Sequence, residues 1–258
     1  MKKLNVPSVL LTLFLIQNKR LLMDYLLDDP LIERTFQDIL LKIRKLQNGE
    51  VVNSMQRRGI EYKVNYGVAI PMLQELAQQY PKNHLLALKL WNKQWRETMI
   101  VATLLEDPLE VTENQIDFWA KNLPTIEMAE QAAMNLFSQT TFAYPKAIEF
   151  CHGKKLVVKI FGLLLAGRLA LTDKNAADEL FDPFFELMSP LSKDAQLALV
   201  FSRVFIQIGM RNSNLHELTI QHATILKTNG SIISQQNADA ILGELDHADI
   251  RALIKARE

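Results

Sequence analysis

The stretch that decides the fold is residues 193–209, KDAQLALVFSRVFIQIG. Its apolar residues follow the i, i+3, i+4 spacing of a helix face, and they are Leu197, Val200, Phe201, Val204, Phe205 and Ile208. The same spacing returns in residues 124–137, at Ile126, Ala129, Ala133 and Leu136. No alternation of apolar and polar residues longer than about four positions competes with this pattern. The sequence therefore predicts an all-α protein.

Short segments rich in Pro, Asn and Gly separate the helical stretches, as at Pro81–Asn83, Pro124 and Pro190. They delimit a helix pair roughly every 35–40 residues, which is the period of HEAT and armadillo arrays. We expect one HEAT-like α-solenoid domain over residues 1–258, of about six antiparallel helix pairs with a right-handed curve, and with capping helices in residues 1–50. The expected helices are 4–27, 31–47, 70–79, 83–105 with a break near Asn92–Lys93, 112–122, 124–138, 144–151, 155–171, 175–188, 193–209, 213–228, 234–243 and 247–256, and residues 48–69 are expected to be less regular.

The composition is that of a globular protein without a uniformly basic surface. The formal net charge is zero, which still allows a local basic patch. The single cysteine, Cys151, excludes an internal disulfide and suits a reducing compartment, so we expect a cytoplasmic protein in which Cys151 is a small buried residue. The apolar run Val9–Ile16 is too short to cross a bilayer and no small-residue cleavage site follows it, so we expect a capping helix there and no membrane association.

The usual constellations of enzymes and metal sites are missing from the sequence. Gly153-Lys154-Lys155 lacks the upstream glycine and the Ser or Thr of a phosphate-binding P-loop. No histidine has a partner at i+4, so we expect no metal and no cofactor. Glu127 and Glu130 lie at i, i+3 on one helix, a pattern typical of a solvated face, and taken alone they are weak catalytic candidates.

Basic residues gather in residues 144–171, which are also the most apolar helical region. Lys159 shares a helix face with Gly162 and Ala166, and a cation on a face of small residues can approach a phosphate closely. Glycine inside a helix is more typical of close packing with another helix than of space for a ligand. Alternatively, the basic residues of 144–171 are charges at solvated helix ends. Helix 155–171 is expected to be the most buried long helix.

Three segments carry motifs in a defined order. The first is Tyr66-Gly67-Val68-Ala69-Ile70-Pro71 with Leu73-Gln74-Glu75-Leu76-Ala77. The second is Leu90-Trp91 with Arg96-Glu97, and the third is Gln207-Ile208-Gly209-Met210-Arg211-Asn212 with Leu215-His216-Glu217. These segments resemble the patterns GV-x-x-P-x-L-x-x-L-A, L-W-x4-R/H-E and R-Q-I-G-K-R-N-x-x-L-H-E of the AlkD-type DNA alkylation repair family of HEAT-like glycosylases. The resemblance covers residues 55–228.

The resemblance implies a curved helical array that holds duplex DNA on a basic concave face and releases N3- or N7-alkylated purines without a metal or cofactor. Such a purine is already cationic, so the remaining task is to stabilise positive charge on the deoxyribose with a carboxylate and aromatic faces. The family's catalytic aspartate falls on Glu130 and its arginine on Lys159. Its two tryptophans fall on Ile126 and Arg203. The three tryptophans of this chain lie on other helices, and Trp119 is expected to pack between repeats.

Both aromatic walls are therefore replaced, and Arg203 either opposes positive charge on the sugar or pairs with Glu130. We predict a DNA-binding member of the family whose glycosylase activity is weak or lost, acting on duplex DNA that is alkylated or distorted. Two alternatives stay open, a protein-binding solenoid whose concave face is not basic, and an active N3/N7-alkylpurine glycosylase that uses Glu130. The expected DNA contacts are Lys159, Arg168, Arg203 and Arg211, with help from Arg57, Arg58 and Lys63.

Overall fold

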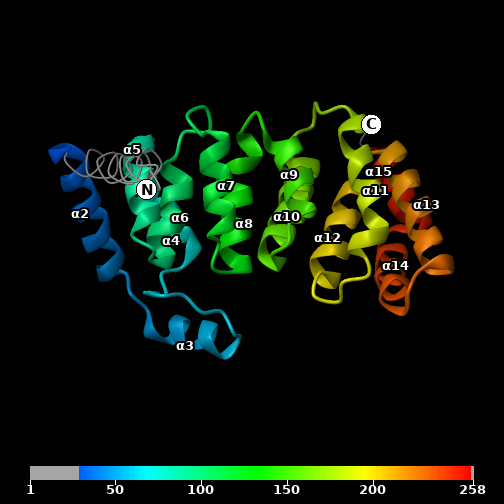
Figure 1. Cartoon of the computed structure of the whole chain (residues 1–258), viewed down its shortest axis with the longest axis horizontal. Helices are drawn as coiled ribbons and strands as arrows, with labels where there is room; N and C mark the ends of the chain where they lie inside the picture. Colours follow the sequence, from blue (N-terminus) through cyan, green and yellow to red (C-terminus); the bar gives the residue numbers. More distant parts are fainter. Residues whose placement is uncertain (1–28, 257–258) are drawn as a thin grey trace, which may run out of the picture. The chain divides into compact units, whose positions relative to one another are not determined.

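The computed structural model describes residues 29–256, and in this part of the chain all regular structure is helical (Figure 1). The predicted all-α fold is therefore confirmed. The chain divides into two compact units at Asp107–Pro108. None of the described helices has the length and hydropathy of a membrane span. The helix expected at 4–27 lies outside the described residues. The single continuous array and its right-handed curve stay predictions.

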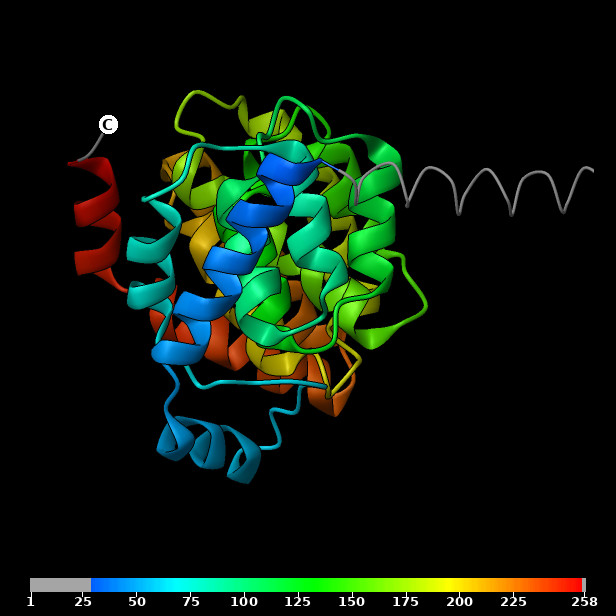
Figure 2. The ribbon, with the colours of Figure 1, turned by 90° about the vertical axis from the view of Figure 1, so that its left-hand side faces the viewer.

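Unit 1 holds five of the helices. They are α2 (Pro30–Lys45), α3 (Gly49–Arg57), α4 (Ile70–Ala77), α5 (His84–Asn92) and α6 (Arg96–Leu105). The break expected near Asn92–Lys93 separates α5 from α6. Helix α3 was not predicted; it has nine residues, of which Met55 alone is buried. Figures 1 and 2 both show α3 apart from the other helices of this unit.

A buried ion pair holds the first two motif segments of unit 1 together. The Glu97 carboxylate accepts hydrogen bonds from the backbone N–H groups of Tyr66 and Val68, at 3.1 and 3.3 Å. Arg96 donates to the Val68 carbonyl oxygen at 2.8 Å and pairs with Glu97 at 3.1 Å. Gly67 has φ +69°, and a Cβ there would lie 2.2 Å from the Asn48 carbonyl oxygen. These motif residues therefore build the loop that enters α4.

Unit 2 holds nine α-helices and two short 3₁₀ helices in its described part. The α-helices are α7 (Glu113–Lys121), α8 (Ile126–Asn135), α9 (Ala143–Cys151), α10 (Leu156–Thr172), α11 (Asp182–Leu191), α12 (Ala198–Gly209), α13 (Ser213–Asn229), α14 (Ile232–Leu245) and α15 (Ala248–Lys255). The 3₁₀ helices are η1 (Phe137–Gln139) and η2 (Asp178–Phe181). Helix α12 begins later than expected, because residues 193–197 form turns. The helix expected at 175–188 is divided between η2 and α11.

Helix α10 is the centre of unit 2, packed against α7, α8, α9 and α12. Eleven of its residues are buried, more than in any other described helix, which confirms the prediction for 155–171. Gly162 lets α9 approach, since a Cβ there would lie 2.7 Å from the Ala147 carbonyl oxygen. Cys151 on α9 is 2% exposed, and burial raises the pKa of its thiol to about 12. Trp119 packs edge-on against Phe137, so the expected packing role is confirmed.

Candidate functional site

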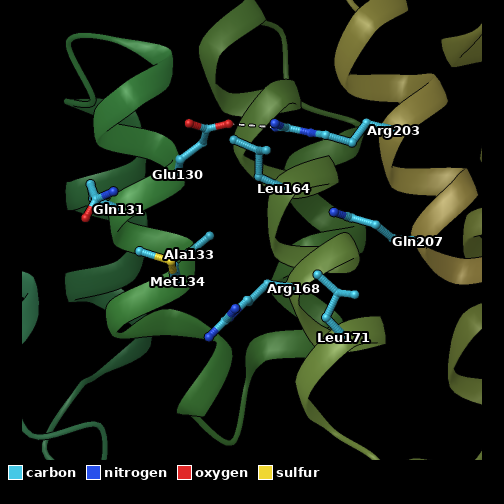
Figure 3. Close-up of a pocket in the computed structure, with 9 residues that line it drawn as sticks. All are labelled: Glu130, Gln131, Ala133, Met134, Leu164, Arg168, Leu171, Arg203 and Gln207. Atoms are coloured by element: carbon cyan, nitrogen blue, oxygen red, sulfur yellow. Dashed lines mark hydrogen bonds and ion pairs between the residues drawn. The ribbon is translucent and has the colours of Figure 1, made fainter. Parts of the chain in front are cut away.

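An open pocket of about 210 Å³ lies on one face of unit 2, between α8, α10 and α12 (Figure 3). Glu130 and Met134 come from α8, and Leu164, Arg168 and Leu171 come from α10. The remaining lining residues are Gln131, Ala133, Arg203 and Gln207. None of these nine residues is aromatic. The pocket therefore contains two guanidinium groups and one carboxylate on walls of aliphatic and amide side chains.

The carboxylate of the pocket is already paired. Arg203 Nη2 on α12 donates to Glu130 Oε1 on α8 at 2.7 Å, and Figure 3 shows this pair at one end of the pocket. The pairing that the sequence offered for Arg203 is therefore observed. The two side chains are 46% and 41% exposed, and an ion pair in contact with water contributes only about 0–1 kcal/mol. A competing anion can displace Glu130 from Arg203 at little cost.

Arg168 supplies the second cation, at the opposite end of the pocket from the Glu130–Arg203 pair (Figure 3). Its guanidinium forms no hydrogen bond or ion pair with any residue in the range 29–256, and its Nε is buried without a partner. A buried donor without a partner is costly, and an arginine fork is suited to two parallel hydrogen bonds from a phosphate. Arg168 is therefore the cation of this pocket that is free to bind an anion.

Close packing between α10 and α12 shapes the wall beside Arg168. A Cβ on Gly167 would lie 2.2 Å from Gln207 Oε1, so the Gln207 side chain crosses the helix at the glycine. Leu164, Arg168 and Leu171 share one face of α10 at i, i+4, i+7, while Arg203 and Gln207 are one turn apart on α12. Sequence reasoning missed Gln207 and the leucines as pocket residues. Leu164 and Leu171 lie four and three residues from Arg168, and Gln207 lies four residues from Arg203. This helical spacing could have identified them as neighbours of the two arginines.

Two positions that were matched to the family's reaction residues do not line the pocket. Ile126 is the first residue of α8 and its side chain is 45% exposed. Lys159 lies half-buried on α10, and its small-residue neighbours Gly162 and Ala166 are buried, Gly162 against α9. Close packing with another helix, the more typical role of a glycine inside a helix, is therefore observed at Gly162, and a phosphate contact by Lys159 stays a prediction. Arg168, two turns further along, brings the cation of α10 into the pocket.

Arg211 is engaged by the backbone. Its guanidinium donates to the carbonyl oxygens of Ala170, Asp173 and Ala176 at 2.5–3.3 Å, and it lies 5.2 Å from the centre of the Phe181 ring. These contacts secure the segment that follows α10. A phosphate contact by Arg211 stays a prediction, and it would have to compete with these backbone contacts.

The rest of the third motif also serves the scaffold. Asn212 caps α13, since its Oδ1 accepts from the Leu215 N–H at 2.9 Å. His216 Nδ1 lies 3.2 Å from the Gly209 carbonyl oxygen. Like the Arg96–Glu97 pair of unit 1, this motif is recognisable because it builds turns and helix ends.

The remaining predicted DNA contacts lie in unit 1. Arg57 is the last residue of α3, and Arg58 and Lys63 follow it; all three are exposed. Arg58 Nε donates to the Ser54 carbonyl oxygen at 3.3 Å, which leaves the rest of its guanidinium in water. A DNA contact by these three residues stays a prediction.

Taken together, the described helices and the pocket define a HEAT-like helical repeat protein with an open, arginine-bearing pocket. Residues 39–152 match the sequence model of the DNA alkylation repair enzyme family. This range contains the first two motifs and Glu130, and it ends before α10. The match and the fold confirm the predicted resemblance to that family.

The structure is also similar to a solved protein from a family described as related to the HEAT-like repeat DNA glycosylases with affinity for branched DNA structures. The TM-score is 0.64 at 16% sequence identity, and the similarity covers 81% of this chain and 95% of the other. At this identity the similarity establishes the fold. Comparison with curated protein sequences finds no significant match.

Proposed function

We propose that this protein binds duplex and distorted DNA through the pocket of unit 2 and has weak or no base-excision activity. The observation that carries the proposal is the unpaired guanidinium of Arg168, in one pocket with an Arg203 whose own partner is easily displaced. Two arginines against one carboxylate leave the pocket with an excess of one positive charge. The affinity for branched DNA described for the family of the solved relative supports the choice of DNA as partner.

In this proposal Arg168 and Arg203 contact phosphates. Arg168 has donors to spare, and a DNA phosphate competes with the Glu130 carboxylate for Arg203. Each neutralised phosphate releases counterions, so binding weakens with salt by about 0.9 units of log affinity per log unit of salt for each contact. With a handful of contacts we expect dissociation constants in the micromolar range at physiological salt.

The same pocket is poorly equipped for base release. Loss of a cationic purine leaves positive charge on the deoxyribose, which a carboxylate and aromatic faces would stabilise. Here Glu130 is paired with a cation, and none of the nine lining residues is aromatic. Arg203 adds positive charge where positive charge has to develop. The arrangement therefore favours binding over catalysis.

The test is binding to plain duplex and to duplex carrying N7-methylguanine, measured by fluorescence anisotropy across a salt series. The double variant Arg168→Ala/Arg203→Ala should lower the salt slope by about 1.8 units. Arg251→Ala is a matched control, because Arg251 on α15 is 47% exposed and pairs with Asp246 much as Arg203 pairs with Glu130. Absence of binding by the wild-type protein at about 50 mM salt, a condition that favours phosphate contacts, would overturn the proposal in favour of a protein-binding scaffold.

A further inference from the structure

A second cavity of unit 2, of about 360 Å³, lies where α9 turns into α10, beside the end of α7. Its rim carries three lysines, and its walls are largely apolar. The lining residues are Lys121, Glu149, Phe150, Gly153, Lys154, Lys155 and Val158. Its volume lies within the range of pockets that hold small organic groups, which is about 300–1,000 Å³. Neither the excision chemistry nor the Arg168 pocket makes use of this site.

Three lysines and one acid line the cavity, so its rim carries an excess of positive charge. All three side chains are exposed. Lys121 and Lys154 form no side-chain hydrogen bond or ion pair with residues 29–256, and Lys155 Nζ donates to the Lys121 carbonyl oxygen at 3.2 Å. The one acid of the rim, Glu149, pairs with Lys146 at 2.8 Å, and Lys146 also pairs with Asp117 at 2.9 Å and with Glu113 at 3.7 Å. An anion in the cavity therefore meets three lysines and one carboxylate.

The inner walls offer a fixed apolar surface. Phe150 is 4% exposed and Val158 is 7% exposed, and the Phe150 ring packs against Phe161 with ring centres 5.3 Å apart. Gly153 makes the turn tight, since a Cβ there would lie 2.8 Å from the Phe150 carbonyl oxygen and 2.9 Å from Val158 Cγ1. The lysines of the turn are thus held close above the apolar walls.

We propose that this cavity binds an unpaired nucleotide of a DNA strand, with its phosphates at Lys121, Lys154 and Lys155 and its base against Phe150 and Val158. The inference rests on the proposed DNA binding and extends it to a second contact. A base inside a duplex is stacked and paired, whereas an unpaired base is free to enter a pocket and contact its apolar walls. The cavity has lysines on its rim and apolar residues on its walls, so it fits a ligand in which a phosphate is joined to a flat apolar group.

The inference requires one DNA molecule to reach both sites along α10. Lys155 precedes α10 and Arg168 lies near its other end, so the two residues are separated by about 20 Å along the helix axis at 1.5 Å per residue. A duplex arm held at Arg168 and an unpaired strand held at Lys155 is the arrangement of a fork or branch. The cavity would thereby give the protein a preference for branched over linear DNA.

The experiment compares three fluorescent probes, a linear duplex, a fork with unpaired arms and oligo-dT. The triple variant Lys121→Ala/Lys154→Ala/Lys155→Ala is compared with Lys174→Ala/Lys193→Ala/Lys255→Ala, which removes three exposed lysines elsewhere in unit 2. The first variant should bind the fork about tenfold more weakly and lose about 2 units of the oligo-dT salt slope, at about 0.7 per single-strand phosphate. Its linear-duplex affinity should change less than about twofold. The control should bind all three probes as the wild type does.

An unchanged ratio of fork to duplex affinity in the first variant would overturn the inference while leaving duplex binding by the Arg168 pocket intact. Loss of oligo-dT binding in a protein that never bound duplex would support the nucleotide site and refute the proposed duplex function. Displacement of oligo-dT by poly-glutamate of equal charge, as efficient as by unlabelled oligo-dT, would show a site for acidic peptide and would also overturn the inference.

Discussion

Two arginines at one end of unit 2 have opposite roles. Arg211, just after α12, donates to three backbone carbonyls and has a buried Nε. Arg203, two turns earlier on α12, is 46% exposed and meets a single carboxylate. The first is recognisable in the sequence as part of a family motif, and the second occupies a position where the family has a different residue. The motif that carries the resemblance is thus made of scaffold residues, whereas Arg203 in the pocket departs from the family's pattern.

Unit 1 teaches the same lesson. Arg96 and Glu97 belong to the second motif, and both are buried against the loop of the first motif. Such residues hold the loop in place whatever the protein binds. A resemblance carried by scaffold residues therefore predicts the fold more firmly than it predicts the reaction.

The largest effect is expected from breaking the buried pair of unit 1. Glu97→Ala removes the acceptor of two backbone N–H groups and leaves the Arg96 cation buried, so unfolding free energy should fall by about 3–5 kcal/mol. Denaturant unfolding followed by circular dichroism measures it. Asp239→Ala, which breaks the exposed pair with Lys227, is the control and should cost about 0–1 kcal/mol. A loss of under about 1 kcal/mol for Glu97→Ala would refute the scaffold role, given the size expected for buried pairs.

Arg211 should show the next largest effect. Arg211→Ala removes charge-assisted hydrogen bonds to three carbonyls, and we expect a loss of about 2–3 kcal/mol in unfolding free energy. The salt slope of DNA binding by the folded protein should stay unchanged. Arg211→Lys keeps the charge but not the fork, so it should also be destabilised. If Arg211→Lys were fully stable and Arg211→Ala lost one unit of salt slope, Arg211 would be a phosphate contact after all.

Arg203 should behave in the opposite way. Arg203→Ala should change unfolding free energy by less than about 1 kcal/mol, because its ion pair is exposed. It should lower the salt slope of duplex binding by about 0.9. Arg251→Ala should match it in stability and leave the slope alone. Equal slopes for Arg203→Ala and wild type would remove Arg203 from the binding surface.

The sequence predicted the helices well where apolar residues recur with helical spacing, as in α10 and α12. It missed α3, a helix of only nine residues in which Met55 alone is buried. The pairing of Arg203 with Glu130 could be anticipated because the two positions were matched to neighbouring residues of the family's pocket. The role of Arg211 could not, since a sequence does not show whether a guanidinium meets backbone carbonyls or solvent. The packing of Gly162 against α9 could be anticipated, because glycine inside a helix is more typical of close packing than of space for a ligand.

The smallest effect is expected from partial restoration of the reaction pocket. Arg203→Trp releases the Glu130 carboxylate and adds one aromatic wall, while Ile126 still leaves the other wall missing. We expect slow release of N7-methylguanine from duplex DNA, slightly above the spontaneous rate, and its loss when Glu130→Gln is added. Release that survives Glu130→Gln would show that the carboxylate is not what Arg203 holds inactive.

The central claim is that this HEAT-like helical scaffold carries a pocket that binds DNA without excising bases. Single-turnover release of N7-methylguanine by the wild-type protein, at concentrations that saturate the duplex, tests it most directly. The account predicts a rate close to that of the DNA alone, because Glu130 is paired with Arg203 and no aromatic residue lines the pocket. Rapid release that Glu130→Gln abolishes would contradict it and make Glu130 the working carboxylate of an active glycosylase.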